Sequence, residues 1–335
     1  MRRSFSNLGL ALGLLSSAAF ATSGSFAASL IAAGWSPGAA VLGRVAIAAL
    51  VLTVPALLQL RSHRTTWTSA RTLLIYGVLA VAGAQLCFFN AVAHLSVAVA
   101  LLVEYSGILL VVGWGWVRHH SRPRRLTALG GATALFGLVL VLNLAGTHHL
   151  ELVGIGWALG ASVGLASYFI VTAEGESSMP PLVMAWGGLA VGAVVLGLAA
   201  AVGALPIRAS GIGVELLGRH VSWLVPLLGL AIVAAVLSYV TGIAGVRLLG
   251  AKLASFVGLT EVLFAVLFAW LLLGQRLEMV QFAGGLLVVA GIALVRLDEV
   301  RGEASTDPRR TTVLPMPNAA VVGRGSDCPG VTTRT

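Results

Sequence analysis

Two acidic residues stand out because each lies inside an apolar run long enough to cross a bilayer. Glu104 lies within residues 98–117, and Glu261 lies within residues 255–274. A charged group at the centre of a transmembrane helix costs roughly 2.5–3.5 kcal/mol on insertion scales, so such residues usually face a protein interior or a water-filled path. The spacing predicts a membrane protein with a polar centre.

Arg44 is the basic residue that matches Glu104 in depth. Arg44 follows Pro37 by seven residues in one apolar span, and Glu104 lies eight residues into another. At 1.5 Å per residue, the two side chains start about 10 and 12 Å below the same membrane surface. We therefore expect them to form an ion pair or to face one polar cavity. An ion pair would fix helix packing, whereas a free Arg44 could bind a substrate carboxylate through two hydrogen bonds.

Glu261 lies near the middle of the membrane. It is ten residues into the apolar span 251–273, which places it about 15 Å deep. Carboxylates at such depths often carry protons in transporters, so Glu261 is a candidate for a proton-coupled step. The alternative is a protonated acid that only forms a hydrogen bond with a neighbouring helix.

Three further polar or aromatic residues are candidates for the lining of a substrate path: Gln85, Trp186 and Tyr239. Each one alone is also consistent with an interhelical hydrogen bond, worth roughly 0.6 kcal/mol on average. The sequence has no legible grouping of nucleophile, base and acid, and no cluster with metal-ligand spacing. It therefore predicts neither an enzyme, nor a metal site, nor a bound cofactor.

The composition supports a membrane class for the whole chain. Of 335 residues, 58% are hydrophobic and 10% are charged, whereas a soluble domain has about 25% charged residues. The 21 basic residues exceed the 12 acidic ones. Because they lie in short loops between apolar spans, they indicate membrane topology and anionic lipid rather than nucleic acid.

The hydrophobic pattern predicts an all-α membrane protein with ten transmembrane helices. Each apolar run has roughly the 20 residues that a span needs, and in a bilayer each must be a helix because its backbone groups must bond internally. The polar residues 297–335 are expected to form a disordered cytoplasmic tail. The predicted spans are 8–33, 37–60, 72–93, 96–117, 126–145, 152–173, 181–204, 222–246, 251–273 and 277–296.

The distribution of arginine predicts the orientation. With the amino terminus inside, 17 basic residues fall on the cytoplasmic side and 3 outside, so both termini are expected in the cytoplasm. Lys252 is the single lysine, and such arginine usage is typical of a GC-rich bacterial genome, so a bacterial inner membrane is the expected location. Residues 1–21 also resemble a signal peptide. Cleavage there would leave nine helices, but the apolar run continues to Ala33, which favours an uncleaved first helix.

An internal repeat accompanies the two acids. When Glu104 is set against Glu261, at an offset of 157 residues, glycine patterns in the following spans nearly align: Gly130, Gly131 and Gly137 with Gly284, Gly285 and Gly291. The repeat predicts two five-helix units, at residues 8–145 and 152–296. Two units with an odd number of spans must enter the membrane in opposite orientations. Such inverted repeats are typical of transporters with a substrate site at the midplane.

These features resemble tandem EamA domains of the drug/metabolite transporter superfamily. The resemblance rests on the Ser36-Pro37 turn before Arg44, the run 98–104, and the turn at 273–276 that leads to Gly284-Gly285. Residues 97–107 are similar to the threonine/homoserine exporter branch. The resemblance implies a secondary transporter that exports a small metabolite, such as an amino acid or a related compound, by alternating access.

Other functions stay open at the level of sequence. The substrate could be a drug-like or cationic compound, and the chain could instead be a membrane scaffold, a sensor or an intramembrane enzyme. No nucleotide-binding motif is legible, so ATP is not expected to be used directly. The expected partners are a small-molecule substrate, the lipid bilayer and, as one candidate coupling ion, the proton.

Overall fold

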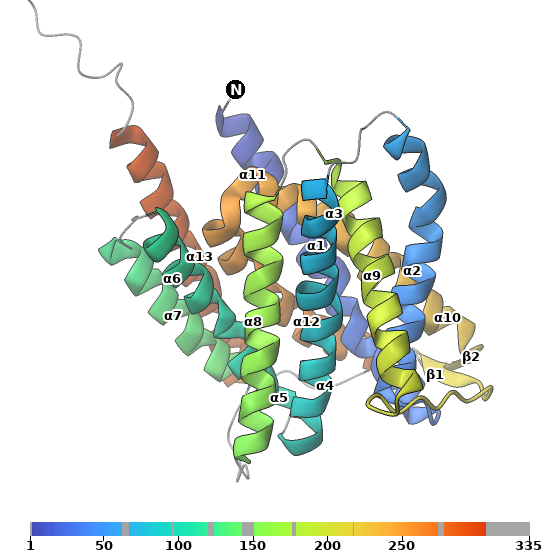
Figure 1. Ribbon diagram of the computed structural model, residues 1–335. Helices are drawn as coiled ribbons and strands as arrows, with labels where there is room; N and C mark the ends of the chain where they lie inside the picture. Colours follow the sequence, from blue (N-terminus) through green and yellow to red (C-terminus); the bar gives the residue numbers. More distant parts are fainter. Residues whose placement is uncertain are drawn as a thin grey trace, which may run out of the picture. The chain divides into compact units, whose positions relative to one another are not determined.

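The computed structural model describes residues 2–61, 67–95, 97–119, 124–142, 151–175, 179–216, 218–273 and 278–305. Within these ranges the chain is helical apart from short turns, the irregular segment 202–213 and one β-hairpin (Figure 1). The helices of the first part of the chain are α1 (Arg2–Ala32), α2 (Pro37–Leu60), α3 (Trp67–Ile75), the π-helix η1 (Tyr76–Gly83), α4 (Ala84–His94), α5 (Val97–Tyr105), α6 (Gly107–His119) and α7 (Arg125–Val141).

The second part of the chain repeats this helical character and adds the hairpin. Its elements are α8 (Leu152–Glu174), α9 (Pro181–Ala201), β1 (Val214–Leu216), β2 (Arg219–Val221), α10 (Leu224–Leu228), the π-helix η2 (Gly229–Leu237), α11 (Ser238–Gly258), α12 (Thr260–Leu273) and α13 (Met279–Ser305).

Eight segments among the described residues are long and apolar enough to cross a membrane. The helix Arg125–Val141 is apolar but has only 17 residues. The segment Leu224–Gly258 has 35 residues and contains Gly250 in a non-helical conformation, with φ 78° and ψ 160°. The chain is therefore a multi-span membrane protein.

Local sequence signals explain where the membrane helices begin. Ser36 caps α2, because its hydroxyl accepts a hydrogen bond from the Ala39 amide at 3.2 Å. Pro37 occupies the first turn of α2, and Pro181 does the same in α9. Proline suits this position since the first amides of a helix have no intrahelical acceptor.

Two spans contain π-helical turns, and two are interrupted. The π-helix η1 follows α3, and η2 follows α10. α5 ends at Tyr105 and α6 begins at Gly107, while α11 ends at Gly258 and α12 begins at Thr260. Such irregular turns are rare and frequently mark functional sites. Each interruption here lies within two residues of a predicted intramembrane acid.

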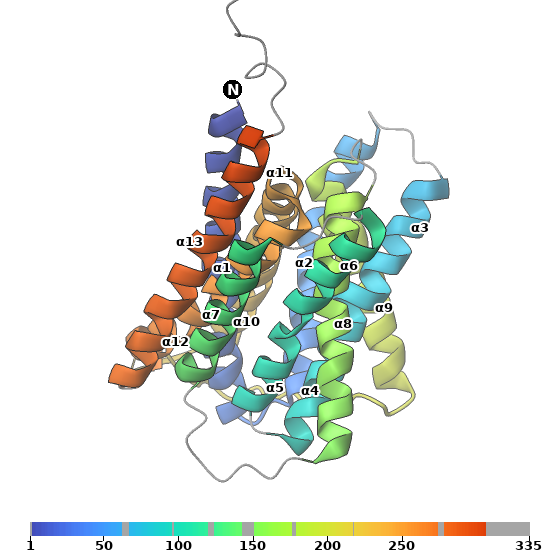
Figure 2. The same ribbon diagram turned by 90° about the vertical axis from the view of Figure 1, so that its left-hand side faces the viewer.

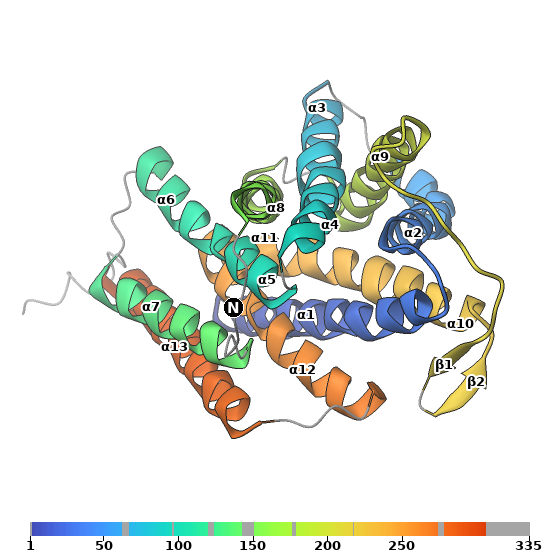
Figure 3. The same ribbon diagram turned by 90° about the horizontal axis from the view of Figure 1, so that it is seen from below.

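Glycines bring α7 and α13 into close contact. A Cβ atom on Gly130 would lie 2.7 Å from the carbonyl oxygen of Gly291, and one on Gly137 would lie 2.7 Å from that of Gly284. The two helices therefore run antiparallel, side by side (Figures 2 and 3). Only glycine permits backbones to approach this closely.

The hairpin covers one end of the helical bundle. β1 and β2 are antiparallel, with Glu215 opposite His220. The segment that precedes β1 is hydrogen-bonded to the turn between α1 and α2. Trp35 Nε1 donates to the Ser210 carbonyl at 2.7 Å, and the Ser36 amide donates to the Arg208 carbonyl at 2.8 Å. We call this the hairpin end, and the end at which α1 begins the N-terminal end (Figure 1).

The last helix extends further than the sequence predicted, through residues 297–305. α13 continues to Ser305, whereas the sequence predicted disorder from residue 297. The stretch 297–305 contains leucine, arginine, glutamate and alanine, which are good helix formers, so a helix that has already formed can extend through it. The rest of the predicted tail, 306–335, lies outside the described residues.

Candidate functional site

An internal cavity of about 770 Å³ lies among α1, α4, α5, α8, α11, α12 and the start of α2. This volume is typical of sites for small molecules. Most of its lining is apolar. The polar and charged lining residues are Ser16, Ser17, Ser23, Ser25, Arg44, Gln85, Glu104, Tyr105, Tyr168, Ser238, Tyr239 and Glu261.

Arg44 contributes an almost fully buried guanidinium group to this cavity. Its residue is 4% exposed, and its Cζ atom lies 4.6 Å from the centre of the Phe20 ring. The Tyr239 side chain lies within its reach, but Nε and Nη2 have no hydrogen-bond partner. A buried cation with free donors is costly unless something pairs with it. The arrangement therefore suits a ligand that brings its own negative charge.

The two acids face the same cavity from different helices. Glu104 lies in the last turn of α5, and Glu261 lies in the first turn of α12. Glu261 is within interaction range of the Tyr105 hydroxyl and of Arg44, and Glu104 is within range of Glu261. No salt bridge joins Arg44 to Glu104 in the part of the chain that the structure describes. Of the two arrangements expected from the sequence, the structure has the shared cavity.

Gln85 and Tyr239 also line the cavity, whereas Trp186 does not. Trp186 lies on α9, which packs against α2, and its Nε1 donates to Thr53 Oγ1 at 3.0 Å. Of the two alternatives given for Trp186, the structure shows the interhelical hydrogen bond.

Further aromatic residues accompany Tyr239 at the site. All four tyrosines of the chain gather here: Tyr105, Tyr168 and Tyr239 line the cavity, and the Tyr76 ring lies 5.9 Å from that of Tyr168. Tyr105 had a usable signal, since it directly follows an intramembrane acid. Phe20 had none, because a phenylalanine in an apolar span is unremarkable without knowledge of its neighbour Arg44.

The site combines one guanidinium, two carboxyl groups and several aromatic rings in an otherwise apolar space. The guanidinium can bind a carboxylate through two parallel hydrogen bonds. The carboxyl groups can bind an ammonium group or exchange protons. The rings offer apolar surface to the remainder of a ligand. The geometry favours binding of a small charged molecule.

Comparison with known proteins identifies a family for both halves of the chain. The model of the EamA-like transporter family matches residues 7–143 and again residues 152–297. The chain is similar to an uncharacterized inner membrane transporter, YicL, of Salmonella typhimurium (strain LT2). The two are 24% identical over 238 residues, which cover 69% of this chain and 75% of that protein.

The fold is also similar to that of a protein whose crystal structure is known. The superposition has a TM-score of 0.72 at 19% sequence identity, and it covers 90% of this chain and 100% of the other. A likeness at this identity concerns the fold alone. The family match, by contrast, covers both halves of the chain. The protein therefore belongs to the EamA-like transporter family.

Proposed function

We propose that this EamA-family membrane transporter is a secondary transporter that exports a small zwitterion, an amino acid or a related compound. The observation that carries the proposal is the buried Arg44, whose Nε and Nη2 donors are unpartnered in a cavity that also holds two carboxyl groups. Arg44 binds the carboxylate of the substrate, and Glu104 binds its ammonium group. The similarity of residues 97–107 to the threonine/homoserine exporters supports the same substrate class.

The proposal includes ten transmembrane helices arranged as two inverted repeats, at residues 8–145 and 152–296. Gly250 ends one span within the longest apolar segment, and residues 251–258 together with α12 form the next span. Arg125–Val141 is counted as a short span. The π-helices begin at Tyr76 and Gly229, and the interruptions fall at Ser106 and Leu259, so both features recur after 153 residues. Recurrent irregularities of this kind support a duplicated unit.

The contact between α7 and α13 supports the inverted relation of the two units. Under the repeat, Gly130 corresponds to Gly284, and Gly137 corresponds to Gly291. The observed close approaches join Gly130 to Gly291 and Gly137 to Gly284. A twofold axis exchanges these two contacts, as in any self-complementary interface.

The structural features also change how the two acids correspond. At an offset of 153 residues, rather than the 157 used to match the acids, Glu104 corresponds to Val257 and Glu261 to Ile108. Glu104 precedes its helix interruption, and Glu261 follows its own. The two acids therefore occupy different positions of the repeat, which gives them separate tasks in transport.

The mechanism that we propose is alternating access, in which one repeat rocks against the other around the cavity. Glu261, which interacts with Tyr105 and Arg44, is the acid that exchanges the coupling proton, and Glu104 binds the substrate. The arginine distribution supports cytoplasmic termini in a bacterial inner membrane.

The test is flux into proteoliposomes with a panel of amino acids, amines without a carboxylate and carboxylates without an amine. Zwitterionic compounds should inhibit one another's flux in the parent protein and in an Arg118→Gln control. This inhibition should be lost in the Arg44→Gln variant. Transport of amines alone, unaffected by Arg44→Gln, would instead support the alternative of a cation or drug exporter. No flux of any compound would leave a scaffold or sensor as the function.

A further inference from the structure

We propose that Tyr76, Tyr168, Tyr239 and Met184 form a gate that closes the cavity toward the N-terminal end, and that Arg247 holds this gate shut. The inference rests on the proposed transport function, since a gate has meaning only if substrate passes. It identifies the residues that must separate when the cavity opens to the other side of the membrane.

The three tyrosines form a continuous column. The ring centres of Tyr76 and Tyr168 are 5.9 Å apart, and those of Tyr168 and Tyr239 are 6.2 Å apart. Tyr168 and Tyr239 form part of the cavity wall, whereas Tyr76 is fully buried behind them. Three helical segments, η1, α8 and α11, thus meet through aromatic contacts at one side of the cavity.

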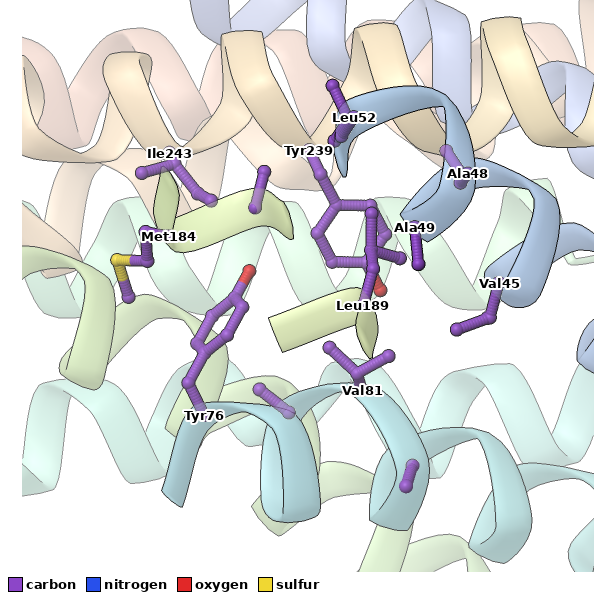
Figure 4. Close-up of a cluster of buried hydrophobic side chains, with 14 of the residues drawn as sticks. Val45, Ala48, Ala49, Leu52, Tyr76, Val81, Met184, Leu189, Tyr239 and Ile243 are labelled. Atoms are coloured by element: carbon purple, nitrogen blue, oxygen red, sulfur yellow. The ribbon is translucent and has the colours of Figure 1, made fainter. Parts of the chain in front are cut away.

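Behind the column the structure is densely packed. Figure 4 shows the Tyr76 and Tyr239 rings entering the same hydrophobic cluster from opposite sides, with Met184 and Ile243 beside them. Met184 and Ile243 have no exposed surface. A substrate could not pass this cluster without moving α9 and α11 apart.

Arg247 links these two helices. It lies on α11, and its Nη1 donates to the Met179 carbonyl just before α9, while its Nη2 contacts the Met184 sulfur at 3.2 Å. Residues 239, 243 and 247 are spaced by four, so they lie on one face of α11. Arg247 therefore lies on the same face of α11 as the gate residue Tyr239, and its contacts hold this face against α9.

The gate has small counterparts at the hairpin end under the proposed repeat. The two proposed units are aligned span by span. Pro37 is set against Pro181, and Ser17 is set against Ser162. The third and eighth spans are aligned by the first residues of their π-helices. The bulky residues Tyr76, Tyr168 and Met184 then correspond to Gly229, Ser23 and Ala40, in that order. Of these small residues, Ser23 and Ala40 line the cavity.

This difference in size decides which end is closed. The cavity extends to Ile31 and Pro37 near the hairpin end, where the positions equivalent to Tyr76, Tyr168 and Met184 carry no large side chain, and Leu86 is the counterpart of Tyr239. At the N-terminal end the same positions are filled by rings and a methionine. The structure is therefore the conformer that faces the hairpin end, and release on the other side requires Arg247 to leave its two partners.

Thiol labelling tests the gate without any substrate. In a background with Cys87→Ala and Cys328→Ser, the reporter Ser17→Cys places one thiol in the cavity wall. Arg61→Cys and Glu215→Cys identify the N-terminal and hairpin faces. A membrane-impermeant maleimide should label the reporter from the hairpin face. The added variant Arg247→Met should raise labelling from the N-terminal face about tenfold, as expected for losing a hydrogen bond from a charged group. Tyr76→Ala should raise the same labelling because it removes a ring from the gate.

Two controls separate gating from misfolding. Arg118→Met removes another arginine, from the end of α6, and should change neither rate. Tyr76→Phe keeps the ring and should leave the gate closed. Equal labelling from both faces before any gate mutation would overturn the proposal. Unchanged labelling in folded, monodisperse Arg247→Met and Tyr76→Ala proteins would do the same. Flux is measured separately, so loss of zwitterion transport would refute the proposed function without affecting the labelling result.

Discussion

Replacing Arg44 by glutamine should impair transport without destabilising the empty protein. Arg44 is buried, its Nε and Nη2 are unpartnered, and it forms no salt bridge with Glu104 in the described part of the chain. A hydrogen bond to a charged group contributes about 1.5–3 kcal/mol. Two such bonds to a substrate carboxylate therefore contribute about 3–6 kcal/mol, which corresponds to a loss of roughly a hundredfold to ten-thousandfold in affinity.

The same substitution removes a buried charge whose desolvation is not fully compensated. Its effect on the substrate-free protein should thus be small or stabilising. The Arg44→Lys variant keeps the charge but presents a single point of contact rather than a planar pair of donors. We expect it to lie between the parent protein and Arg44→Gln in apparent affinity.

The assay combines proteoliposome flux with thermal unfolding in detergent. A zwitterion at one hundred times its Kd should stabilise the parent protein by about 2.7 kcal/mol, and it should not shift the melting temperature of Arg44→Gln. The reasoning is refuted if Arg44→Gln retains the parental apparent affinity. It is also refuted if the variant loses activity only because the empty protein has become strongly unstable, since Arg44 would then have a structural role.

Three further predictions concern helix contacts and proton coupling. Gly137→Leu should lower stability by about 1–3 kcal/mol through overpacking against α13, measured as a lower melting temperature, whereas Gly197→Ala, with open space around it, should be neutral or stabilising. Glu261→Gln should abolish the response of flux to an imposed pH gradient while substrate exchange continues; an unchanged response would remove Glu261 from coupling. Trp186→Phe should leave flux intact and cost about 1 kcal/mol for the lost bond to Thr53, and a change in substrate selectivity would contradict its placement outside the cavity.

From the sequence it was easier to predict which residues share the cavity than how each helix is rotated about its axis. Helical rise converts residue number into depth, so the match of Arg44 with Glu104 could be made without a structure. The facing direction could not be obtained for Trp186, because α9 is apolar on all sides and carries no amphipathic pattern. The depth of a residue in a membrane helix follows from its distance along the sequence, whereas the rotation of the helix about its axis depends on packing against its neighbours.

The repeat offset shows a second limit of sequence reasoning. Matching Glu104 to Glu261 by residue type gave an offset of 157, whereas the π-helices and helix interruptions recur after 153 residues. The difference of four residues is about one helical turn. Backbone irregularities leave little trace in an apolar sequence, so the chemically conspicuous residues were aligned although they lie on opposite sides of the interruption.

Under the inverted repeat that we propose, the two units supply two similar conformations, but identical units would give these conformations equal energies. Here the gate positions hold Tyr76, Tyr168 and Met184 at one end and small residues at the other. Closing the N-terminal end buries the rings of Tyr76 and Tyr168, whose counterparts Gly229 and Ser23 carry no aromatic surface. Empty protein should therefore favour the conformer that faces the hairpin end. A substrate that draws Arg44 and the two acids together must supply the differential binding energy that opens the gate.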